Sequence, residues 1–296
     1  MKQFDPEYLE LDRWIARAES TPADWLVSRF TAELQGEVIG YGHVRRSPSM
    51  KPGVFLSTVA IGNEWRCKGF GSLMVNEAES QGRQLGATRL FKTVRDENAD
   101  HVKFFEKRGY KTQVALATAE LDLSGDQFDI QPWISQMQSH QIQLKSWSEI
   151  GDSETNRQKL FELFSEADKD EPGVAVFGSF GRPEFERDTF DDGYWNPDWL
   201  WVATFGEEWI GMHQILRITE SGSACGIGYT GVVKHHRGKG IGRAMKQVGI
   251  ATAQKAGFTK IKTNNDKTNA PMLKINEQLG FQSANGWLFM GKDITG

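Results

Sequence analysis

The sequence predicts a mixed α/β (α+β) protein built from two copies of one domain. Arg66-Cys67-Lys68-Gly69-Phe70-Gly71 lies 171 positions before Arg237-Gly238-Lys239-Gly240-Ile241-Gly242, and the offset continues without a gap to Tyr110 and Phe281. Over these 45 aligned positions 12 residues are identical, whereas unrelated segments of ordinary composition should share roughly three. Both copies also alternate strand-like and helix-like hydrophobic patterns. A repeat with this alternation predicts that one fold was used twice.

The first copy is expected to begin with a hairpin. Apolar runs at 25–33 and 38–44 are joined by Gln35-Gly36-Glu37, which is typical of two antiparallel strands and a tight turn. A strand at 54–61 then leads into the Arg66 loop. Helices are predicted at 71–85 and 99–107, ended by Gly86 and Gly109.

The second copy follows the same plan with a longer N-terminal part before its hairpin, which we call the front end. Its predicted elements are strand 142–147, helix 153–167, a hairpin of 198–205 and 209–218, strand 225–233, helix 241–256, strand 260–263, helix 270–279 and final strands from Phe281 to Met290. The first copy has only about two dozen residues before its hairpin and is expected to have lost part of this front end.

These patterns predict two domains, each a mixed, mainly antiparallel sheet flanked by helices. We expect the domains at 1–124 and 141–296, with a linker at 125–140 that starts a short helix at Pro132. The boundaries follow the repeat and the turn residues Ser124-Gly125-Asp126.

Composition limits the class of protein. The 296 residues suit about two domains, and a net charge of −4 gives no overall attraction to nucleic acid or an anionic membrane. No apolar run approaches the length of a membrane span or a signal core, so a cytoplasmic location without a nucleic-acid or membrane partner is expected. The two cysteines, Cys67 and Cys225, lie at non-equivalent repeat positions, which argues against a disulfide framework and against a zinc site built from them alone.

A glycine-rich loop follows a strand and precedes a helix in both copies. The pattern Arg-x-x-Gly-x-Gly presents consecutive backbone N–H groups at a helix N-terminus, which suits a pyrophosphate. Arg237, Lys239 and Arg243 add positive charge in the second copy, as Arg66 and Lys68 do in the first. The alternative is an ordinary strand-to-helix turn with solvated basic residues. Two copies at one spacing disfavour that alternative.

These motifs resemble those of the GNAT superfamily of acyl-CoA N-acyltransferases, here as two domains in tandem. The similarity is best at 57–110 and 229–281 and includes the segment from Asn269 to Gly280-Phe281. It implies acetyl-CoA as cosubstrate, no metal, and direct attack of an amine on the thioester. The coenzyme-binding residues that it implies in the second copy are Val232, Val233, Arg237, Gly238, Lys239, Gly240, Ile241, Gly242, Arg243 and Asn269. A possible second site in the first copy comprises Ile61, Arg66, Lys68, Gly69, Gly71 and Ser72.

One position departs from the family pattern. The family's usual tyrosine, which can protonate the departing thiolate, falls on Asn276 in the second copy and on Phe105 in the first. Phe105 cannot donate a proton, and Asn276 can donate only a hydrogen bond. Acyl transfer can still proceed, because holding an amine against the carbonyl supplies most of the acceleration.

We expect catalysis in the second copy. It keeps Gly238 where the first copy has Cys67, and it has the full front end. It also has polar residues where the acyl group should lie: Thr230, Asn264 and Asn276 replace Val59, Thr93 and Phe105 of the first copy. Asn276 and Asn264 are the expected polarising or positioning residues.

The predicted function is acetyl transfer to the primary amine of a small-molecule acceptor by a monomer or homodimer. A non-catalytic acyl-CoA-binding or sensing module and an acyltransferase for a longer acyl chain are the alternatives. Candidates for a general base are Glu207 and Glu208 in a hairpin turn, where solvated turn residues are favoured. The acidic, aromatic stretch 185–201, with Asp188, Asp191 and Asp192, could attract a cation or simply cap the surface.

Two further patterns are judged to be coincidental. Gly226-x-Gly228-x-x-Gly231 matches a dinucleotide-binding pattern, but Val232 and Val233 continue a strand where a helix should begin. His235 and His236 suggest a metal only superficially, because no further ligand set is spaced to help them.

Overall fold

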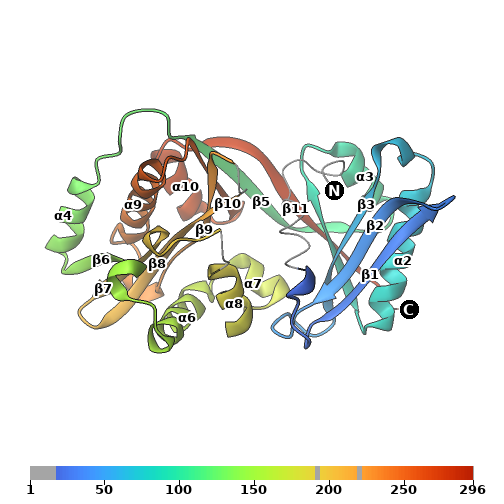
Figure 1. Cartoon of the computed structure of the whole chain (residues 1–296), viewed down its shortest axis with the longest axis horizontal. Helices are drawn as coiled ribbons and strands as arrows, with labels where there is room; N and C mark the ends of the chain where they lie inside the picture. The colour runs from blue at the N-terminus through green and yellow to red at the C-terminus, as the bar shows by residue number, and fades with distance from the viewer. Residues whose placement is uncertain (1–17, 191–193, 219–221, 296) are drawn as a thin grey trace. The chain divides into compact units, whose positions relative to one another are not determined.

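The computed structural model describes residues 18–190, 194–218 and 222–295, which form two compact units (Figure 1). The first unit contains the described residues up to Leu116, together with Ala175–Gly178 and the chain from Asn285 onward. The second unit contains Ala117–Val174 and Ser179–Ala284. Among the described residues, no helix has both the length and the apolar character needed to cross a membrane. The predicted mixed α/β class with two domains is confirmed.

The first unit is a twisted sheet with helices. Its elements before residue 110 are β1 (Leu26–Leu34), β2 (Glu37–Arg46), β3 (Val54–Ile61), α2 (Phe70–Gln84), β4 (Arg89–Arg95) and α3 (Ala99–Glu106). Strands β1, β2 and β3 run antiparallel, and β4 joins β3 in parallel. The fully buried Ala78 of α2 packs with Val44, Phe55 and Leu90 of the strands, so the apolar face of α2 forms the core with one face of the sheet.

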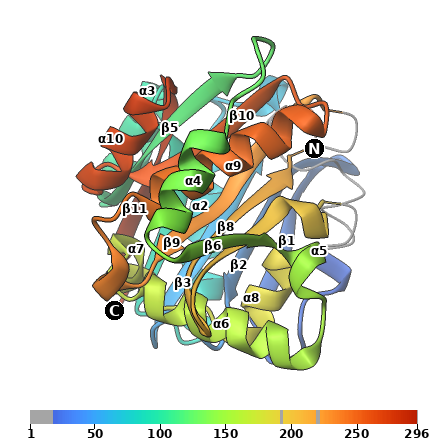
Figure 2. The same cartoon turned by 90° about the vertical axis from the view of Figure 1, so that its left-hand side faces the viewer.

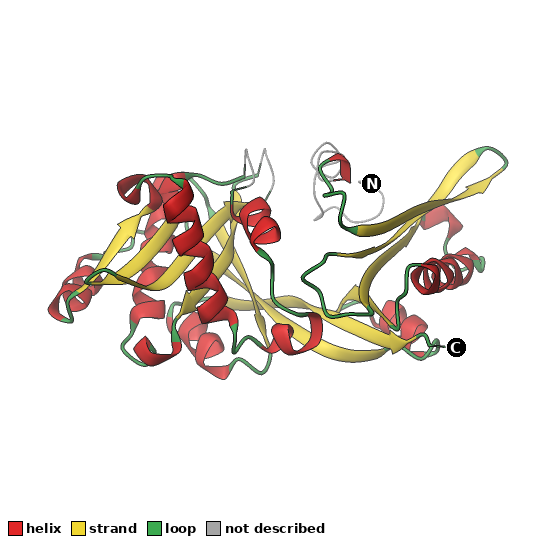
Figure 3. Cartoon of the chain, turned by 90° about the horizontal axis from the view of Figure 1, so that it is seen from below, coloured by secondary structure: helices red, strands yellow, loops and turns green. Residues whose placement is uncertain are grey.

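The second unit repeats this arrangement behind a longer front end (Figures 1 and 3). The elements of this copy are α4 (Gln131–Ser139), β6 (Ile142–Ser146), α5 (Trp147–Ile150), α6 (Glu154–Asp168), α7 (Pro172–Phe177), α8 (Arg182–Thr189), β7 (Leu200–Phe205), β8 (Glu208–Arg217), β9 (Ala224–Val232), α9 (Ile241–Lys255), β10 (Lys260–Asp266) and α10 (Ala270–Gln278). Strands β6 to β9 are antiparallel neighbours, and β10 runs parallel to β9. Helices α6 and α9 pack on opposite faces of this sheet (Figure 2).

The last strands of the two copies are exchanged. β5 (Lys111–Asp122) and β11 (Gln282–Asp293) are repeat equivalents at the same offset of 171. β11 pairs antiparallel with β4 and completes the first unit, whereas β5 is the neighbour of β10. The predicted limit that put all of 141–296 in one domain therefore differs from the structure, in which residues from Asn285 onward belong to the first unit. The repeat offset shows which strands are equivalent but not which neighbour each strand will choose.

The predicted linker is an ordered part of the second unit. Helix α4, within 125–140, packs against β6 and α9, with Met137 only 1% exposed. The Gln254 side chain of α9 donates to the carbonyls of Leu123 and Asp126, both at 3.1 Å. Residues 125–140 therefore pack against the second unit and are not a flexible linker.

The end of α7 belongs to the first unit. The backbone N–H of Lys51 donates to the Phe177 carbonyl at 2.9 Å. The Phe177 ring lies 4.8 Å from that of Phe91 and 5.2 Å from that of Phe289, measured between centroids. A short segment of the second copy is therefore part of the aromatic packing of the first unit.

Candidate active site

The loop of the second unit contains two glycines in the left-handed region. β9 ends at Val232, a short 3-10 turn follows, and α9 begins at Ile241. Gly238 and Gly240 both have φ of +79°, which side chains oppose. No heavy atom lies within 4 Å of where a Cβ would stand at either glycine, and residues 237–240 are exposed. Helix α9 therefore begins in an open loop, where its first N–H groups and its dipole suit an anion.

The loop of the first unit has the same backbone shape. Gly69 has φ of +90°, and Cys67 has φ of +59°, at the positions equivalent to Gly240 and Gly238. Two of its polar side chains have protein partners. The Ser72 hydroxyl accepts from Arg108, and the Lys68 ammonium lies 4.7 Å from the ring centroid of Trp65. Cys67 therefore does not change the loop, and loop shape does not distinguish the two copies.

Replacing Cys67 by glycine is expected to raise the free energy of unfolding by about 0.5–1 kcal/mol. A left-handed conformation costs an L-residue about 1–2 kcal/mol, a cost that glycine avoids. Part of this gain is lost because glycine increases the conformational entropy of the unfolded chain. Urea denaturation with linear extrapolation measures the change. Cys67→Ala is the matched control and should bring no gain, since alanine keeps the strained conformation. Destabilisation by Cys67→Gly would show that contacts of the thiol outweigh the strain.

Arg237 fastens the loop to its surroundings. Its Nε donates to the Val232 carbonyl at 2.8 Å, and its two terminal nitrogens donate to Asp170 at 2.8 Å and to the Ala167 carbonyl at 3.0 Å. The hydrogen bond from Arg237 lowers the pKa of the Asp170 carboxyl. In the first unit Arg66 Nε likewise donates to a strand-end carbonyl, that of Ile61, at 3.3 Å. The arginine of this motif therefore connects strand and loop in both copies.

The other predicted cations of the second loop lie differently. Lys239 is exposed, with Nζ 3.3 Å from His236 Nδ1. The Arg243 guanidinium lies over the ring of Trp133, 4.6 Å from its centroid. Of these two cations, Lys239 therefore lies at the loop itself, whereas Arg243 lies in the first turn of α9, against α4.

Strands β9 and β10 diverge beside the loop. Their ladder pairs Ala224–Gly226 with Lys260–Lys262, although both strands continue beyond these pairs. The Val233 N–H donates to the Ile210 carbonyl of β8 at 2.9 Å. Because backbone groups alternate sides along a strand, those of Thr230 and Val232 point to the side from which β10 has moved away.

The two valines at the end of β9 are therefore not equivalent. Val232 borders this opening, although its carbonyl accepts from Arg237. Both backbone groups of Val233 have protein partners, because its carbonyl accepts from the His236 N–H at 3.0 Å. In the first unit β3 and β4 diverge in the same way after the pair of Ser57 and Lys92.

A buried polar cluster lies on the α9 face of the second unit. Lys246 of α9 is 1% exposed, and its Nζ donates to Asn276 Oδ1 of α10 at 2.6 Å. Asn276, itself 3% exposed, donates from Nδ2 to Asn265 Oδ1 of β10 at 2.7 Å. The ring centroid of Phe281 lies 5.6 Å from the ammonium. Burial lowers the pKa of Lys246 to about 7, so the group can gain or lose a proton near neutral pH.

A buried histidine lies near this cluster. His213 of β8 is fully buried, and its Nδ1 is 2.8 Å from the Thr230 hydroxyl. A Cβ at Gly249 of α9 would lie 1.9 Å from His213 Nε2, so the ring requires glycine there. Burial, and then the charge of Lys246, lowers the pKa of His213 to about 3. His213 is therefore neutral at physiological pH.

Asn264 and Asn269 do not join this cluster. Asn264 is exposed and accepts from the Thr118 hydroxyl of β5 at 2.5 Å, because side chains alternate along β10 and Asn265 takes the buried face. Asn269 caps α10, and its Oδ1 accepts from the Met272 N–H at 3.3 Å. Of the two asparagines predicted to act on the acyl group, only Asn276 lies in the buried cluster.

Carboxyl groups gather on the opposite face, around Tyr229. The Tyr229 ring lies 4.8 Å from that of Phe164 of α6, between centroids. Asp168, at the end of α6, is 8% exposed, and burial raises the pKa of its carboxyl to about 6. Burial, then the charges of Asp168 and Asp266, raises the pKa of Glu171. Because Tyr229 and Thr230 point to opposite faces, these carboxyls and Lys246 lie on different faces of the sheet.

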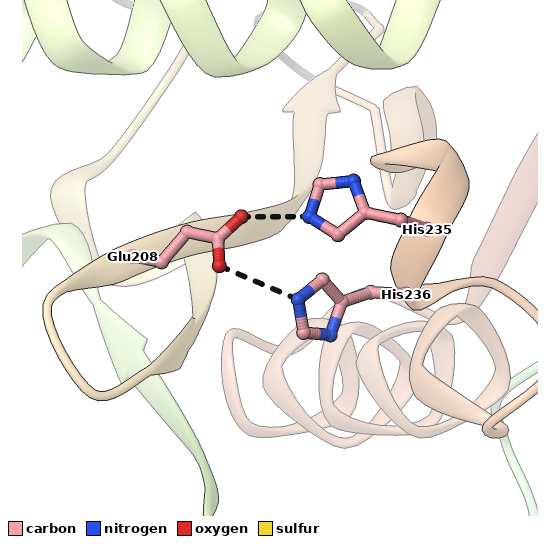
Figure 4. A group of neighbouring side chains, drawn as sticks. All are labelled: Glu208, His235 and His236. Carbon is pink, nitrogen blue, oxygen red and sulfur yellow. Dashed lines mark hydrogen bonds and ion pairs between the residues drawn. The ribbon is translucent and has the colours of Figure 1, made fainter.

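Glu208 joins the two adjacent histidines (Figure 4). Its oxygens lie 2.9 Å from His235 Nε2 and 3.4 Å from His236 Nε2. The expectation that nothing is spaced to help these histidines is wrong, since the β7–β8 hairpin brings Glu208 beside them in a group that could hold a metal ion. Lys239 approaches His236, and Arg237 follows directly in the chain. The nearby positive charges of Lys239 and Arg237 disfavour a bound cation. We therefore interpret the contacts of Glu208 as a structural support of the loop and not as a metal site.

The other acidic candidates do not provide a clear base. Glu208 pairs with the histidines, and its hydrogen bond with His235 lowers the pKa of its carboxyl. Glu207 is exposed in the turn, and Asp188 lies 3.6 Å from Arg187. Asp191 and Asp192 lie outside the described residues.

Sequence reasoning missed Lys246, His213 and Asp168. A signal for Lys246 was present, because the repeat places it opposite Val75 of the first copy and on the apolar stripe of its helix. Nothing in the pattern around Asp168 distinguished it from an ordinary carboxylate at a helix end.

A family model described as "Acetyltransferase (GNAT) family" matches residues 1–110 and 158–281. A GCN5-related N-acetyltransferase from Sphaerobacter thermophilus is 17% identical with a TM-score of 0.67, over 88% of this chain and 78% of that chain. A tandem GNAT protein from the clavulanic acid biosynthesis pathway is 16% identical with a TM-score of 0.72, over 96% and 87%. A glucosamine N-acetyltransferase region of a fungal β-N-acetylglucosaminidase is 14% identical with a TM-score of 0.71, over 96% and 35%. At these identities the likeness to the solved structures is one of fold.

Proposed function

This chain belongs to the GNAT acetyltransferase family, and on that premise we propose that it transfers an acetyl group from acetyl-CoA to the primary amine of a small molecule. We place the transfer in the second unit. The observation that carries the use of acetyl-CoA is the open loop at the start of α9, next to the point where β9 and β10 diverge. The choice of the second unit rests on the buried pair of Lys246 and Asn276, which the first unit replaces by Val75 and Phe105.

The loop suits the pyrophosphate of coenzyme A. Its glycines leave open space around the first N–H groups of α9, and Lys239 adds an exposed positive charge. The backbone groups of Thr230 and Val232 that face the opening suit the amides of the pantetheine arm, which would add as a strand does. Asn269, as the cap of α10, lies at the start of the helix that carries Asn276.

We infer that the carboxyl groups around Tyr229 bind the acceptor amine and accept its proton. An amine must be uncharged when it attacks the thioester, so a group that accepts its proton is needed. Asp168 has a pKa of about 6 because it is buried, which suits a carboxylate that takes up a proton near neutral pH. Asp168 and Glu171 together favour a small cationic amine as the acceptor.

The reaction follows from holding the two substrates together. The acceptor nitrogen attacks the acetyl carbonyl carbon, the carbon–sulfur bond breaks, and coenzyme A leaves as the thiol after gaining a proton. The acceptor nitrogen loses a proton to Asp168 or to water. Positioning the amine against the carbonyl supplies most of the acceleration.

The acceptor proposed here is a small amine. Among the similar structures, the fungal region is described as a glucosamine N-acetyltransferase, and glucosamine is an amine of this size. We place glucosamine first in a panel that also contains aminoglycosides and amino acids. A longer acyl donor remains an alternative that the same panel can test with different acyl-CoA substrates.

The first unit fits a non-catalytic role better. Its loop has the same shape, but Val75 and Phe105 stand where the second unit has Lys246 and Asn276. A unit that can hold coenzyme A but has neither the amine nor the amide at these two positions is expected to bind without turnover. Release of thiol from acetyl-CoA in the presence of amines distinguishes an enzyme from a binding module.

Gly240→Trp is expected to weaken acetyl-CoA binding by about 100-fold, because the indole would fill the open space that the loop leaves for phosphate. Calorimetric titration of the whole chain measures the affinity and the number of sites. Gly69→Trp is the matched control, since Gly69 has the same left-handed conformation in the equally open loop of the first unit. A site that survives Gly240→Trp and is lost with Gly69→Trp would assign the coenzyme to the first unit. Absence of binding by the unaltered chain would reject acetyl-CoA.

A further inference from the structure

Three positions that are apolar in the first unit are polar in the second. Val75, Val94 and Tyr110 form one buried cluster of the first unit, with Phe105 packed against it. Their repeat equivalents in the second unit are Lys246, Asn265, Phe281 and Asn276 respectively. The contacts are kept, because Lys246 bonds Asn276, Asn276 bonds Asn265, and Phe281 faces the ammonium.

The fold does not need these polar groups. The first unit packs the same four positions with apolar and aromatic side chains, in the same elements. Burying an ammonium and one amide, and half-burying a second amide, costs stability that valine and phenylalanine do not cost. A chemical role explains why one copy carries the polar set.

The cluster borders the opening between the diverging strands. Asn265 lies on β10 beyond Lys262, the last residue of this strand that pairs with β9, and its side chain bonds Asn276 of α10. Lys246 lies on the helix that starts at the glycine loop. Among the described residues, burial and then the charge of Lys246 also lower the pKa of His213 of β8, so His213 is neutral above pH 5 and carries no competing charge beside the ammonium.

We propose that Lys246 gives the departing coenzyme A thiolate its proton and that Asn276 positions the ammonium for this step. The inference rests on the proposed acetyl transfer in the second unit. When the carbon–sulfur bond breaks, its electron pair goes to sulfur, the Lys246 ammonium transfers one proton to that sulfur, and Lys246 is left as a neutral amine. The acceptor nitrogen releases its proton on the Asp168 side of the sheet. Lys246 regains a proton from water before the next turnover, so atoms and charges balance.

Burial supports this direction of transfer. A buried ammonium is less stable than a neutral amine, so Lys246 releases its proton more readily than a lysine in water. The hydrogen bond from Nζ to Asn276 Oδ1 holds the ammonium in place.

The first copy supplies a matched pair of variants. Lys246→Val with Asn276→Phe reproduces the valine and phenylalanine that the fold already accommodates at 75 and 105. Lys246→Val with Asn276→Tyr has the same shape and differs by one hydroxyl group, which can donate a proton. Single-turnover acetyl transfer to hydroxylamine at saturating acetyl-CoA, followed by thiol release, measures the step without a specific acceptor. Calorimetry checks that both variants still bind acetyl-CoA.

The phenylalanine pair is expected to bind acetyl-CoA like the unaltered chain and to transfer about 100-fold more slowly. The tyrosine pair is expected to recover at least about tenfold of this loss. The unaltered chain should slow as the pH rises above about 7, where the Lys246 ammonium is lost, and the phenylalanine pair should lack that decline.

Two outcomes would overturn the proton-donor role while leaving the proposed function intact. These are an undiminished rate in the phenylalanine pair, and equal rates in the phenylalanine and tyrosine pairs. If the unaltered chain binds acetyl-CoA but transfers to no amine, the proposed function itself fails, and the role of Lys246 fails with it. That result is visible before any variant is made.

Discussion

Fragments 1–124 and 125–296 are expected to be unfolded or aggregated when each is made alone, and to assemble into a folded protein when made together. The reason is the exchange of β5 and β11. Fragment 1–124 lacks β11, which pairs with β4 along seven residues from Trp287 to Asp293. Fragment 125–296 lacks β5, the neighbour of β10. Circular dichroism and urea denaturation of each fragment and of the mixture measure the effect.

The expected loss is as large as the stability of a domain. β11 and the residue after it bring the buried Met290 and Ile294 into the first unit, and removing such side chains costs about 2–5 kcal/mol each. Lys292 of the same strand donates to both oxygens of the largely buried Glu79, at 2.8 and 2.9 Å. A whole domain is stable by only about 5–15 kcal/mol.

A full-length chain cleaved between Ser124 and Gly125, after insertion of a protease site in this exposed turn, is the control. It has the same break but keeps every strand, and it should stay folded. A monomeric fragment 1–124 that unfolds cooperatively would contradict the prediction. It would mean that β5 can replace β11 beside β4, with Ala119 in the place of Met290 and Leu121 in that of Lys292.

Raising the pH from 7 to 8.5 is expected to stabilise the unaltered protein, and Lys246→Met should remove about 2 kcal/mol of this gain. The pKa of Lys246 is about 7 in the folded protein and 10.5 in the unfolded chain. The folded state therefore binds fewer protons over this interval, so the free energy of unfolding rises with pH by about 1.4 kcal/mol per unit. The cost of burying the ammonium is fully present below pH 7 and is relieved as the pH rises towards 10.5.

Urea denaturation at the two pH values measures this difference, and each variant is compared with the unaltered chain so that other groups cancel. Lys92→Met should remove a similar amount, because burial also lowers the pKa of Lys92 to about 7. Lys255→Met is the matched control, since Lys255 is exposed at the end of the same helix as Lys246. If Lys246→Met follows the same pH dependence as Lys255→Met, Lys246 is not buried as an ammonium.

Most helices and strands of the fold can be predicted from local sequence patterns. The helix predicted at 241–256 is α9 at Ile241–Lys255, and the strand predicted at 225–233 is β9 at Ala224–Val232. Hydrophobic period and glycine stops are properties of neighbouring residues, so a sequence reveals them directly. The sequence also predicts the loop, because the backbone at those positions requires its glycines.

Properties that depend on distant residues could not be predicted in this way. Asn264 and Asn265 are adjacent, and a shift of one residue decides which of them bonds Asn276. The choice between β5 and β11 as the neighbour of β4 depends on pairing, which equivalent strands leave open. Burial of Lys246 and Asp168 likewise follows from packing and not from the residues around them.

The strand exchange also has a consequence for synthesis on the ribosome. β4 is complete at Arg95, but its neighbour β11 begins only at Gln282, about 190 residues later. At about 5–20 residues per second, β4 waits about 10–40 s for its partner. An unpaired strand edge can join other chains in that interval. Arg89, Lys92 and Arg95 give this strand three basic residues, and their mutual repulsion would keep one nascent chain from pairing with the next until the last strand has emerged.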